Sequence, residues 1–269
     1  MENRLYEPGD IPVVILAGGL GTRLREQTEF IPKPMVPIGT RPILWHIMKI
    51  YAHFGFRRFI ICTGYKGEVI KEYFLHYRFR NSDFTITLGN HEKIEIHSSS
   101  TEDDWEVTLA DTGVKAMTGA RINRVKQYID TEFFLLTYGD GVANIEIDKL
   151  VEFHLSHGKI ATITGVKPPS RFGELVSRGD FVVEFVEKPQ EGIGLISGGF
   201  FVFSTQMFDY LEDDDKCTLE REPLERIAAD GGLVVYRHSG FWQCMDTLRD
   251  MNTLNESWES GNASWKIWK

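Results

Sequence analysis

The stretch that decides the fold reads Val13-Val14-Ile15-Leu16-Ala17-Gly18-Gly19-Leu20-Gly21-Thr22-Arg23-Leu24 and, after a spacer, Pro32-Lys33-Pro34-Met35-Val36-Pro37. Its apolar start predicts a buried parallel strand, because aliphatic residues fill both faces of such strands. Three glycines in four residues follow, and they let the backbone turn sharply and approach a bound group. Backbone N–H groups of such a loop can cradle an anion. With Arg23 and Lys33 added, the stretch indicates a polyphosphate site.

The loop differs from two better-known phosphate loops. No Gly-Lys-Ser/Thr follows the glycines, which excludes a Walker A motif. Leu24 occupies the third glycine position of a dinucleotide-binding fingerprint that would begin at Gly19. The simpler alternative is a tight turn between a strand and a helix. The pairs Thr22-Arg23 and Lys33-Pro34 favour the phosphate site over that alternative.

Composition limits the classes of function. The 269 residues carry a net charge of −9, which argues against nucleic-acid binding, because such proteins usually present a basic face. No apolar run approaches the roughly 20 residues that span a bilayer, and the polar N-terminus does not resemble a signal peptide. The three cysteines (Cys62, Cys217 and Cys244) are widely spaced, which favours buried reduced thiols. We therefore expect a cytoplasmic protein without nucleic-acid or membrane partners.

Alternating apolar patterns predict an α/β fold with a mostly parallel sheet. A helix is expected over 42–54, strands over 59–63 and 83–88, and a helix over 68–77 between them. Further strands are expected over 133–137, 160–166, 173–176, 181–186, 196–203 and 233–237, and further helices over 120–129, 219–229 and 248–258. We expect one domain over 1–269, Rossmann-like, as a mostly parallel mixed sheet with helices on both faces. A small β insertion is expected over 89–110 and a C-terminal helical tail over 247–269.

Two aspartates and a lysine stand out as candidates for chemistry. Asp140 follows the strand 133–137 between two glycines, where a carboxylate suits Mg²⁺, although Asp-Gly is also a common turn pair. Asp246 is a second carboxylate, whose simpler alternative is a helix N-cap. Lys188, after the strand 181–186, could hold a monophosphate as a point charge or lie on the surface in solvent.

The quoted stretch resembles the signature of the sugar-1-phosphate nucleotidylyltransferase family. Gly-Gly-x-Gly-Thr-Arg-Leu followed by Pro-Lys-Pro-Met-x-Pro-Ile is long and specific. Most members carry Leu-x-Pro-x-Thr after the arginine, whereas this chain has Leu24-Arg25-Glu26-Gln27-Thr28. The glutamate in place of proline resembles the branch that makes CDP-glucose, and further matches cover nearly the whole chain.

The resemblance implies roles for particular residues. Arg23, Lys33, Asp140 and Asp246 are the expected catalytic residues, and Asp140 and Asp246 the expected ligands of Mg²⁺. Sugar phosphate is expected at Gly173, Glu187, Lys188, Gly198 and Gly199. Nucleotide is expected at Leu16, Ala17, Gly18, Gly19, Leu20, Gly21, Thr22, Arg23, Lys33, Asp111, Gly113, Thr118, Arg121 and Asp140.

The implied reaction is that of a cytidylyltransferase, in which CTP and α-D-glucose 1-phosphate give CDP-glucose and pyrophosphate. Two alternatives remain open at this stage. One is the same chemistry with UTP, dTTP or another phosphorylated acceptor, and the other is a catalytically silent nucleotide-binding subunit. The resemblance also implies a homo-oligomer.

Two further features have structural interpretations. His154 and His157 have the spacing of a metal pair, but with no third ligand nearby we expect a surface pair at a helix end. The tryptophans Trp258, Trp265 and Trp268 give the tail an apolar character, and it is expected to dock on its own domain or on a neighbouring subunit.

Overall fold

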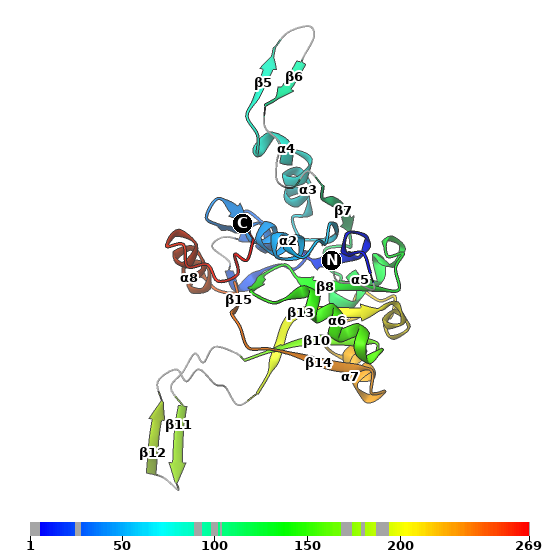
Figure 1. The fold of residues 1–269 in the computed structure, drawn as a ribbon, viewed down its shortest axis with the longest axis vertical. Coiled ribbons are helices and arrows are strands. Elements are labelled where there is room, and N and C mark those ends of the chain that lie inside the picture. Colours follow the sequence, from blue (N-terminus) through cyan, green and yellow to red (C-terminus); the bar gives the residue numbers. More distant parts are fainter. Residues whose placement is uncertain are drawn as a thin grey trace.

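The computed structural model describes residues 6–24, 28–88, 93–97, 102, 104–167, 174–178, 181–186 and 194–268. A seven-stranded sheet of order β14-β10-β13-β8-β1-β4-β7 forms its centre (Figure 1). Neighbouring strands run parallel except around β13, which is antiparallel to both β8 and β10. The predicted mostly parallel mixed sheet is confirmed. Its strands are β1 (Pro12–Leu16), β4 (Arg58–Thr63), β7 (Glu106–Asp111), β8 (Phe133–Tyr138), β10 (Ala161–Val166), β13 (Ile196–Ser204) and β14 (Leu233–His238).

Helices cover both faces of this sheet because successive side chains of a strand point to opposite faces. In β1, Val13 and Ile15 belong to one buried cluster with residues of α2 and α6, whereas Val14 and Leu16 belong to another with residues of α5 and α7. The continuous apolar run of β1 thus serves two cores. The helices are α2 (Ile43–His53), α3 (Gly67–Leu75), α4 (Tyr77–Arg80), α5 (Thr118–Arg124), α6 (Ile147–His157), α7 (Glu222–Ala229) and α8 (Leu248–Glu259). None of the helices among the described residues is long and apolar enough to cross a bilayer.

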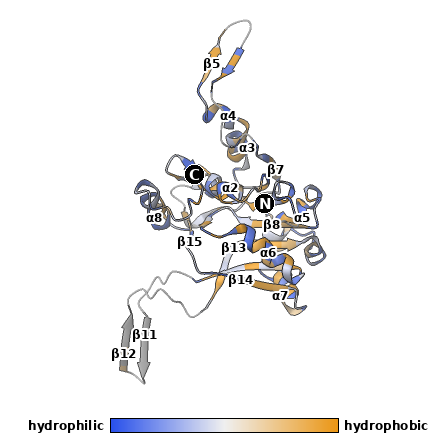
Figure 2. Ribbon diagram, in the orientation of Figure 1, coloured by the Kyte–Doolittle hydropathy of each residue, from blue (hydrophilic) through white to orange (hydrophobic). Residues whose placement is uncertain are grey.

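The region before β7 differs from the prediction. Residues 83–88 were expected as a strand of the main sheet, but β5 (Phe84–Thr87) pairs with β6 (Lys93–Ile96) in a separate hairpin that stands away from the body (Figure 1). The strand that extends the main sheet is β7, and all of it except the last residue lies in the range 89–110 that was predicted as an insertion. Alternating apolar and polar residues give β5 and β6 no continuous apolar run to bury between helices (Figure 2).

Three further strand pairs complete the described fold. A hairpin of β11 (Glu174–Arg178) and β12 (Phe181–Val186) lies apart from the body (Figure 1). Two further pairs are short. β2 (Pro37–Ile38) pairs with β3 (Arg41–Pro42) just after the Pro-Lys-Pro motif, and β9 (Gly141–Ala143), which follows β8, pairs with β15 (Trp242–Cys244).

The C-terminal tail docks on its own chain. Trp265 is fully buried and Trp268 nearly so, both in the cluster that contains α2. His46 of α2 lies at the centre of this contact, with its ring near those of Trp258, Trp265 and Trp268. The backbone carbonyl of Ile38 can only accept from His46 Nε2 (3.0 Å), so Nδ1 is free to accept from Trp265 Nε1 (3.4 Å). The neutral ring thereby joins α2 to the tail.

The expected surface histidine pair is wrong for His154, which is buried. His154 Nδ1 and His157 Nε2 both contact Thr162 Oγ1, at 2.9 and 2.8 Å. Burial lowers the pKa of His154 to about 4. The pair therefore fastens α6 to β10.

We predict that acid weakens the fold through His46. Burial lowers its pKa to about 4, below the 6.5 of the exposed side chain, so the unfolded chain binds more protons between these values. The contribution of neutral His46 is present above pH 6.5 and is lost as the pH falls towards 4, on the order of 3 kcal/mol. Urea unfolding of the wild type and of His46→Gln between pH 7 and 4.5 measures it. We expect a smaller pH slope in the variant, and identical slopes would contradict the assignment.

Candidate active site

The glycine-rich loop and Asp140 meet at one edge of the sheet. Leu16 at the end of β1 stands opposite Tyr138 at the end of β8, because the two strands are parallel neighbours. The Gly139 amide donates to the Leu16 carbonyl (3.0 Å) and ties the two loops together just past the strands. Ligands of open α/β sheets bind at this edge, beyond the carboxyl ends of the strands.

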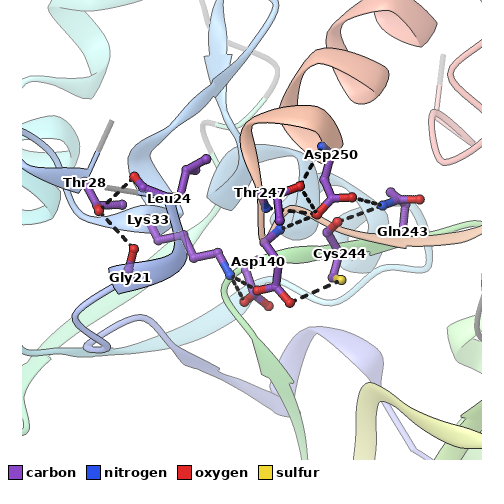
Figure 3. A network of polar contacts seen from close by, with 10 residues as sticks. Gly21, Leu24, Thr28, Lys33, Asp140, Gln243, Cys244, Thr247 and Asp250 are labelled. Carbon is purple, nitrogen blue, oxygen red and sulfur yellow. Dashed lines mark hydrogen bonds and ion pairs between the residues drawn. The ribbon is translucent and has the colours of Figure 1, made fainter. Parts of the chain in front are cut away.

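Lys33 links the two aspartates that sequence reasoning singled out. Its ammonium donates to Asp140 Oδ2 (2.5 Å) and to Asp246 Oδ1 (2.6 Å), as Figure 3 shows in part. Lys33 begins a short 3-10 turn, Lys33–Met35, between two prolines whose rings restrict the backbone. The Pro-Lys-Pro sequence therefore restricts the backbone that carries the lysine, and the two ion pairs hold its ammonium.

The environment keeps Lys33 charged. Its side chain is 11% exposed, and those of Asp140 and Asp246 are 29% and 14% exposed. Burial alone would lower the pKa of the Lys33 ammonium, but the charge of Asp140 and the hydrogen bonds to both carboxylates outweigh burial and raise that pKa. An ammonium and two carboxylates leave one net negative charge at this point.

Backbone pairing brings Asp140 and Asp246 together although 106 positions separate them in the sequence. Gly141 of β9 stands opposite Cys244 of β15, and the Met245 amide donates to the Asp140 carbonyl (2.8 Å). Each aspartate thus flanks the same short antiparallel pair. The expectation that the fold joins these residues agrees with this geometry.

A cavity of about 350 Å³ lies over the glycine-rich loop. Its wall includes ten of the residues expected to bind nucleotide, together with Pro34, Ala116, Met117, Tyr138 and Gly139. The ten are Leu16, Ala17, Gly18, Gly19, Gly21, Thr22, Lys33, Thr118, Arg121 and Asp140.

Arg121 holds the glycine-rich loop through hydrogen bonds to backbone carbonyls. It is buried, and its guanidinium donates to the Gly18 carbonyl (2.9 Å), the Thr63 carbonyl (3.2 Å) and Thr112 Oγ1 (2.8 Å). A Cβ at position 18 would lie 2.0 Å from Arg121 Nη1, so any larger residue there would displace the guanidinium. Burial lowers the pKa of Arg121 from its usual high range. Arg121 therefore anchors the loop and places a positive charge beneath it.

Thr28 is a positioning residue that sequence reasoning missed. Its buried hydroxyl lies 3.0 Å from each of the Gly21 and Leu24 carbonyls, at the two ends of the turn that contains Arg23 (Figure 3). In the sequence analysis Thr28 was used only as the last residue of the motif Leu24-Arg25-Glu26-Gln27-Thr28. Its hydroxyl could have been expected to bond to the backbone of the preceding turn.

A second cavity, of about 280 Å³, adjoins the first and shares Tyr138 and Asp140 with it. Gly198, Gly199 and Asp246 line it with Cys244 and Trp242. The Trp242 indole donates to the Gly198 carbonyl (2.7 Å). Gly199 has φ +78°, and a Cβ there would lie 2.6 Å from the Tyr138 ring. The double glycine thus gives this cavity a wall of bare backbone.

The remaining expected site residues do not line these cavities or cannot be placed. Leu20 is exposed beside a shallow hollow with Thr22 and Thr28. Asp111 accepts from the Gly113 amide (3.0 Å) in a turn, and neither residue lines the cavity. The residues outside the described part of the structure are Gly173, Glu187, Lys188 and, for its side chain, Arg23.

The chain is similar to known proteins along most of its length. The sequence profile described as nucleotidyl transferase matches residues 12–256. The chain is 52% identical over 257 residues to the glucose-1-phosphate cytidylyltransferase of Salmonella typhimurium, covering 95% of this chain and 99% of that protein. A Bacillus subtilis protein named "Probable glucose-1-phosphate cytidylyltransferase" is 46% identical over 255 residues, with the same coverage. The crystal structure of HddC from Yersinia pseudotuberculosis complexed with GMP-PN has a TM-score of 0.67 and 25% identity, covering 92% of this chain and 99% of HddC.

We predict that neighbouring glycines of the loop respond differently to alanine. Gly18→Ala would displace Arg121 and cost about 1–3 kcal/mol of unfolding free energy. At Gly19 a Cβ meets nothing within 4 Å, so Gly19→Ala is the matched control and should leave the melting temperature nearly unchanged. Thermal unfolding of both variants tests the support role of Arg121, and equal losses would refute it.

Proposed function

Because the chain belongs to the nucleotidyl transferase family, we propose that it transfers a cytidylyl group from CTP to α-D-glucose 1-phosphate and releases pyrophosphate. The product is CDP-glucose. Support for the base and the acceptor comes from the glucose-1-phosphate cytidylyltransferase of Salmonella typhimurium, to which about half of the aligned residues are identical along nearly the full length of both chains.

The observation that carries the proposal is the position of the Lys33 ion pairs. The lysine and both carboxylates lie where the two cavities meet, since Asp140 lines both, Lys33 lines the first and Asp246 lines the second. Two substrates that react with each other need adjoining pockets with the charged groups at the junction. In this account CTP occupies the cavity over the glycine-rich loop, and glucose 1-phosphate occupies the cavity beside Gly198 and Gly199.

The chemistry is one in-line displacement at phosphorus. An oxygen of the sugar phosphate forms a bond to the α-phosphorus of CTP, and the bond from that phosphorus to the bridging oxygen of pyrophosphate breaks. The attacking oxygen is already anionic, so no side chain has to remove a proton. Catalysis then consists of positioning and of neutralising charge in the transition state.

The residues of this chain share that work. The backbone of Gly18–Gly21 and the side chain of Arg23 hold the triphosphate, and Lys33 neutralises charge near the α-phosphate. We assign nucleotide recognition to Thr118 and Arg121, which line the cavity given to CTP, whereas Asp111 and Gly113 lie outside its lining. The acceptor is held by Lys188 at its phosphate, by Glu187 at its hydroxyls, and by Gly173, Gly198 and Gly199.

Asp140 and Asp246 fit a bound Mg²⁺. Both present carboxylate oxygens, the ligands that Mg²⁺ prefers, against a single cation, and the three charges leave one negative charge to be balanced. Within the described residues no group of three or more histidines, cysteines and carboxylates is placed to hold a metal ion, and Cys244 contacts the pair only through its thiol, which donates to Asp246 Oδ2 (3.7 Å). That matches an ion that keeps waters and takes substrate phosphates as its other ligands. When bound, Mg²⁺ supplies charge neutralisation to the phosphate oxygens.

We also propose a cytoplasmic homo-oligomer. Both substrates are charged phosphate esters of the cell interior, in keeping with such a location. The oligomer rests on the family resemblance alone. The C-terminal tail does not support it, because Trp265 and Trp268 are buried against their own chain. Light scattering coupled to size exclusion measures the assembly, and a monomer would contradict this part of the proposal.

Pyrophosphate release with Mg²⁺ and glucose 1-phosphate tests the reaction, with CTP, UTP, dTTP, ATP and GTP compared in parallel. We expect release with CTP far above the rest. Strong release with UTP or dTTP would keep the mechanism and change the base. Silence with all five, combined with calorimetric binding of CTP, would replace the enzyme by a nucleotide-binding subunit.

We predict that Lys33→Ala and Asp140→Asn each lower kcat at least about 100-fold. The first removes the ammonium that neutralises phosphate charge in the transition state, and the second removes a carboxylate that would hold Mg²⁺. The matched control is Lys49→Ala. Lys49 is also a half-buried lysine in an ion pair, with Glu102 (3.1 Å), but it lies outside both cavities. Initial rates at saturating substrates and Mg²⁺ check this. Near-normal kcat in either site variant would remove its assigned role.

A further inference from the structure

The segment that carries Asp246 is a short link between two elements. Strand β15 ends at Cys244, and helix α8 begins at Leu248 after its N-cap, Thr247. The Met245 amide fixes the start of this link to the Asp140 carbonyl. The direction of the Asp246 carboxylate therefore depends on what holds the other end.

Asp250 holds that end with four hydrogen bonds. Its Oδ2 accepts from the Asp246 amide (3.1 Å), the Thr247 amide (2.9 Å) and Thr247 Oγ1 (2.9 Å). Its Oδ1 accepts from Gln243 Nε2 (3.2 Å), which brings strand β15 into the same contact. Figure 3 shows this carboxylate between the strand and the helix. Asp250 is only 9% exposed, so its lone pairs are committed to these donors.

A capping box explains only part of this arrangement. The contacts between Asp250 and Thr247 form a regular box at the start of α8, which stabilises a helix. The bonds to the Asp246 amide and to Gln243 lie outside the box. They tie Asp250 to the Asp246 backbone and to the Gln243 side chain, on either side of Met245, and the Asp246 carboxylate accepts from Lys33 Nζ (2.6 Å).

We propose that Asp250 is a positioning residue for the metal-binding pair, holding Asp246 at the angle that lets it share one cation with Asp140. This inference rests on the proposed function, since it assumes that Asp246 binds the divalent ion. Residues that orient a metal ligand typically change metal affinity by roughly 10–100-fold when they are removed.

Thr247→Ala is the matched control for Asp250→Ala. It removes the hydroxyl that caps α8, at a cost of about 1 kcal/mol, but leaves the Asp246 amide and its acceptor in place. Both variants should lower the melting temperature. Only Asp250→Ala should weaken divalent-ion binding. If Asp250 served only to cap the helix, the two variants would bind the ion equally well.

The experiment has two readouts. The first is the dissociation constant for Mn²⁺, measured by electron paramagnetic resonance on the full chain without substrates. The second is the Mg²⁺ concentration that gives half-maximal pyrophosphate release. We expect Asp250→Ala to raise both values about 10-fold or more, and Thr247→Ala to change each less than twofold. Where Asp250→Ala does not fold, Gln243→Leu removes the strand-side bond, and a rise of both values supports the proposal.

Equal metal readouts for Asp250→Ala and Thr247→Ala would overturn the positioning role. So would wild-type protein that shows no Mn²⁺ binding, because Asp246 would then have no metal to hold. Failure of the proposed function gives a different pattern. The wild type would release no pyrophosphate with CTP, while the Mn²⁺ titrations would still separate the two variants.

Discussion

The ammonium of Lys33, held between the carboxylates of Asp140 and Asp246, is the interaction on which the site depends. Three charged groups that are mostly removed from water would each be costly alone, and their mutual contacts offset that cost. The same burial strengthens their field on anything bound beside them, because less solvent screens the charges. The trio keeps one net negative charge. In the proposed reaction this negative charge is balanced by the added cation, and the lysine neutralises a phosphate.

The sheet makes this interaction possible. Lys33 and Asp140 are 107 residues apart, and Lys33 and Asp246 are 213 apart, so only long-range pairing can join them. Strands β1 and β8 end side by side, and β9 pairs with β15 immediately beyond that edge. Buried polar side chains then hold the loops in place through hydrogen bonds. Arg121 and Thr28 hold the glycine-rich loop, and Asp250 holds the link to α8. Lys33, Asp140 and Asp246 thus lie on short segments next to loops that these buried side chains hold in place.

Sequence reasoning located the apolar strands and the charged site, because both depend on local pattern. A run such as Val13-Val14-Ile15-Leu16 has few alternatives to a buried strand, and the Pro-Lys-Pro motif is specific. Sequence reasoning failed where contacts between distant residues decide which strands pair and which side chains are buried. The strand at 84–87 alternates like a sheet strand, yet β7 takes the place beside β4. Arg121 was assigned to the nucleotide, but nothing local revealed that its partners would be the carbonyls of Gly18 and Thr63. His154 gave no local signal that it would be buried on Thr162.

The most direct test of the account is a crystal structure of the chain with CDP-glucose and Mg²⁺. The account predicts the cytidine over the glycine-rich loop and the glucose beside Gly198 and Gly199. It predicts the diphosphate at the junction of the two cavities, with Lys33 on a phosphate and the ion on Asp140 and Asp246. A product that lies with both halves in one cavity, or an ion held away from these two carboxylates, would contradict it.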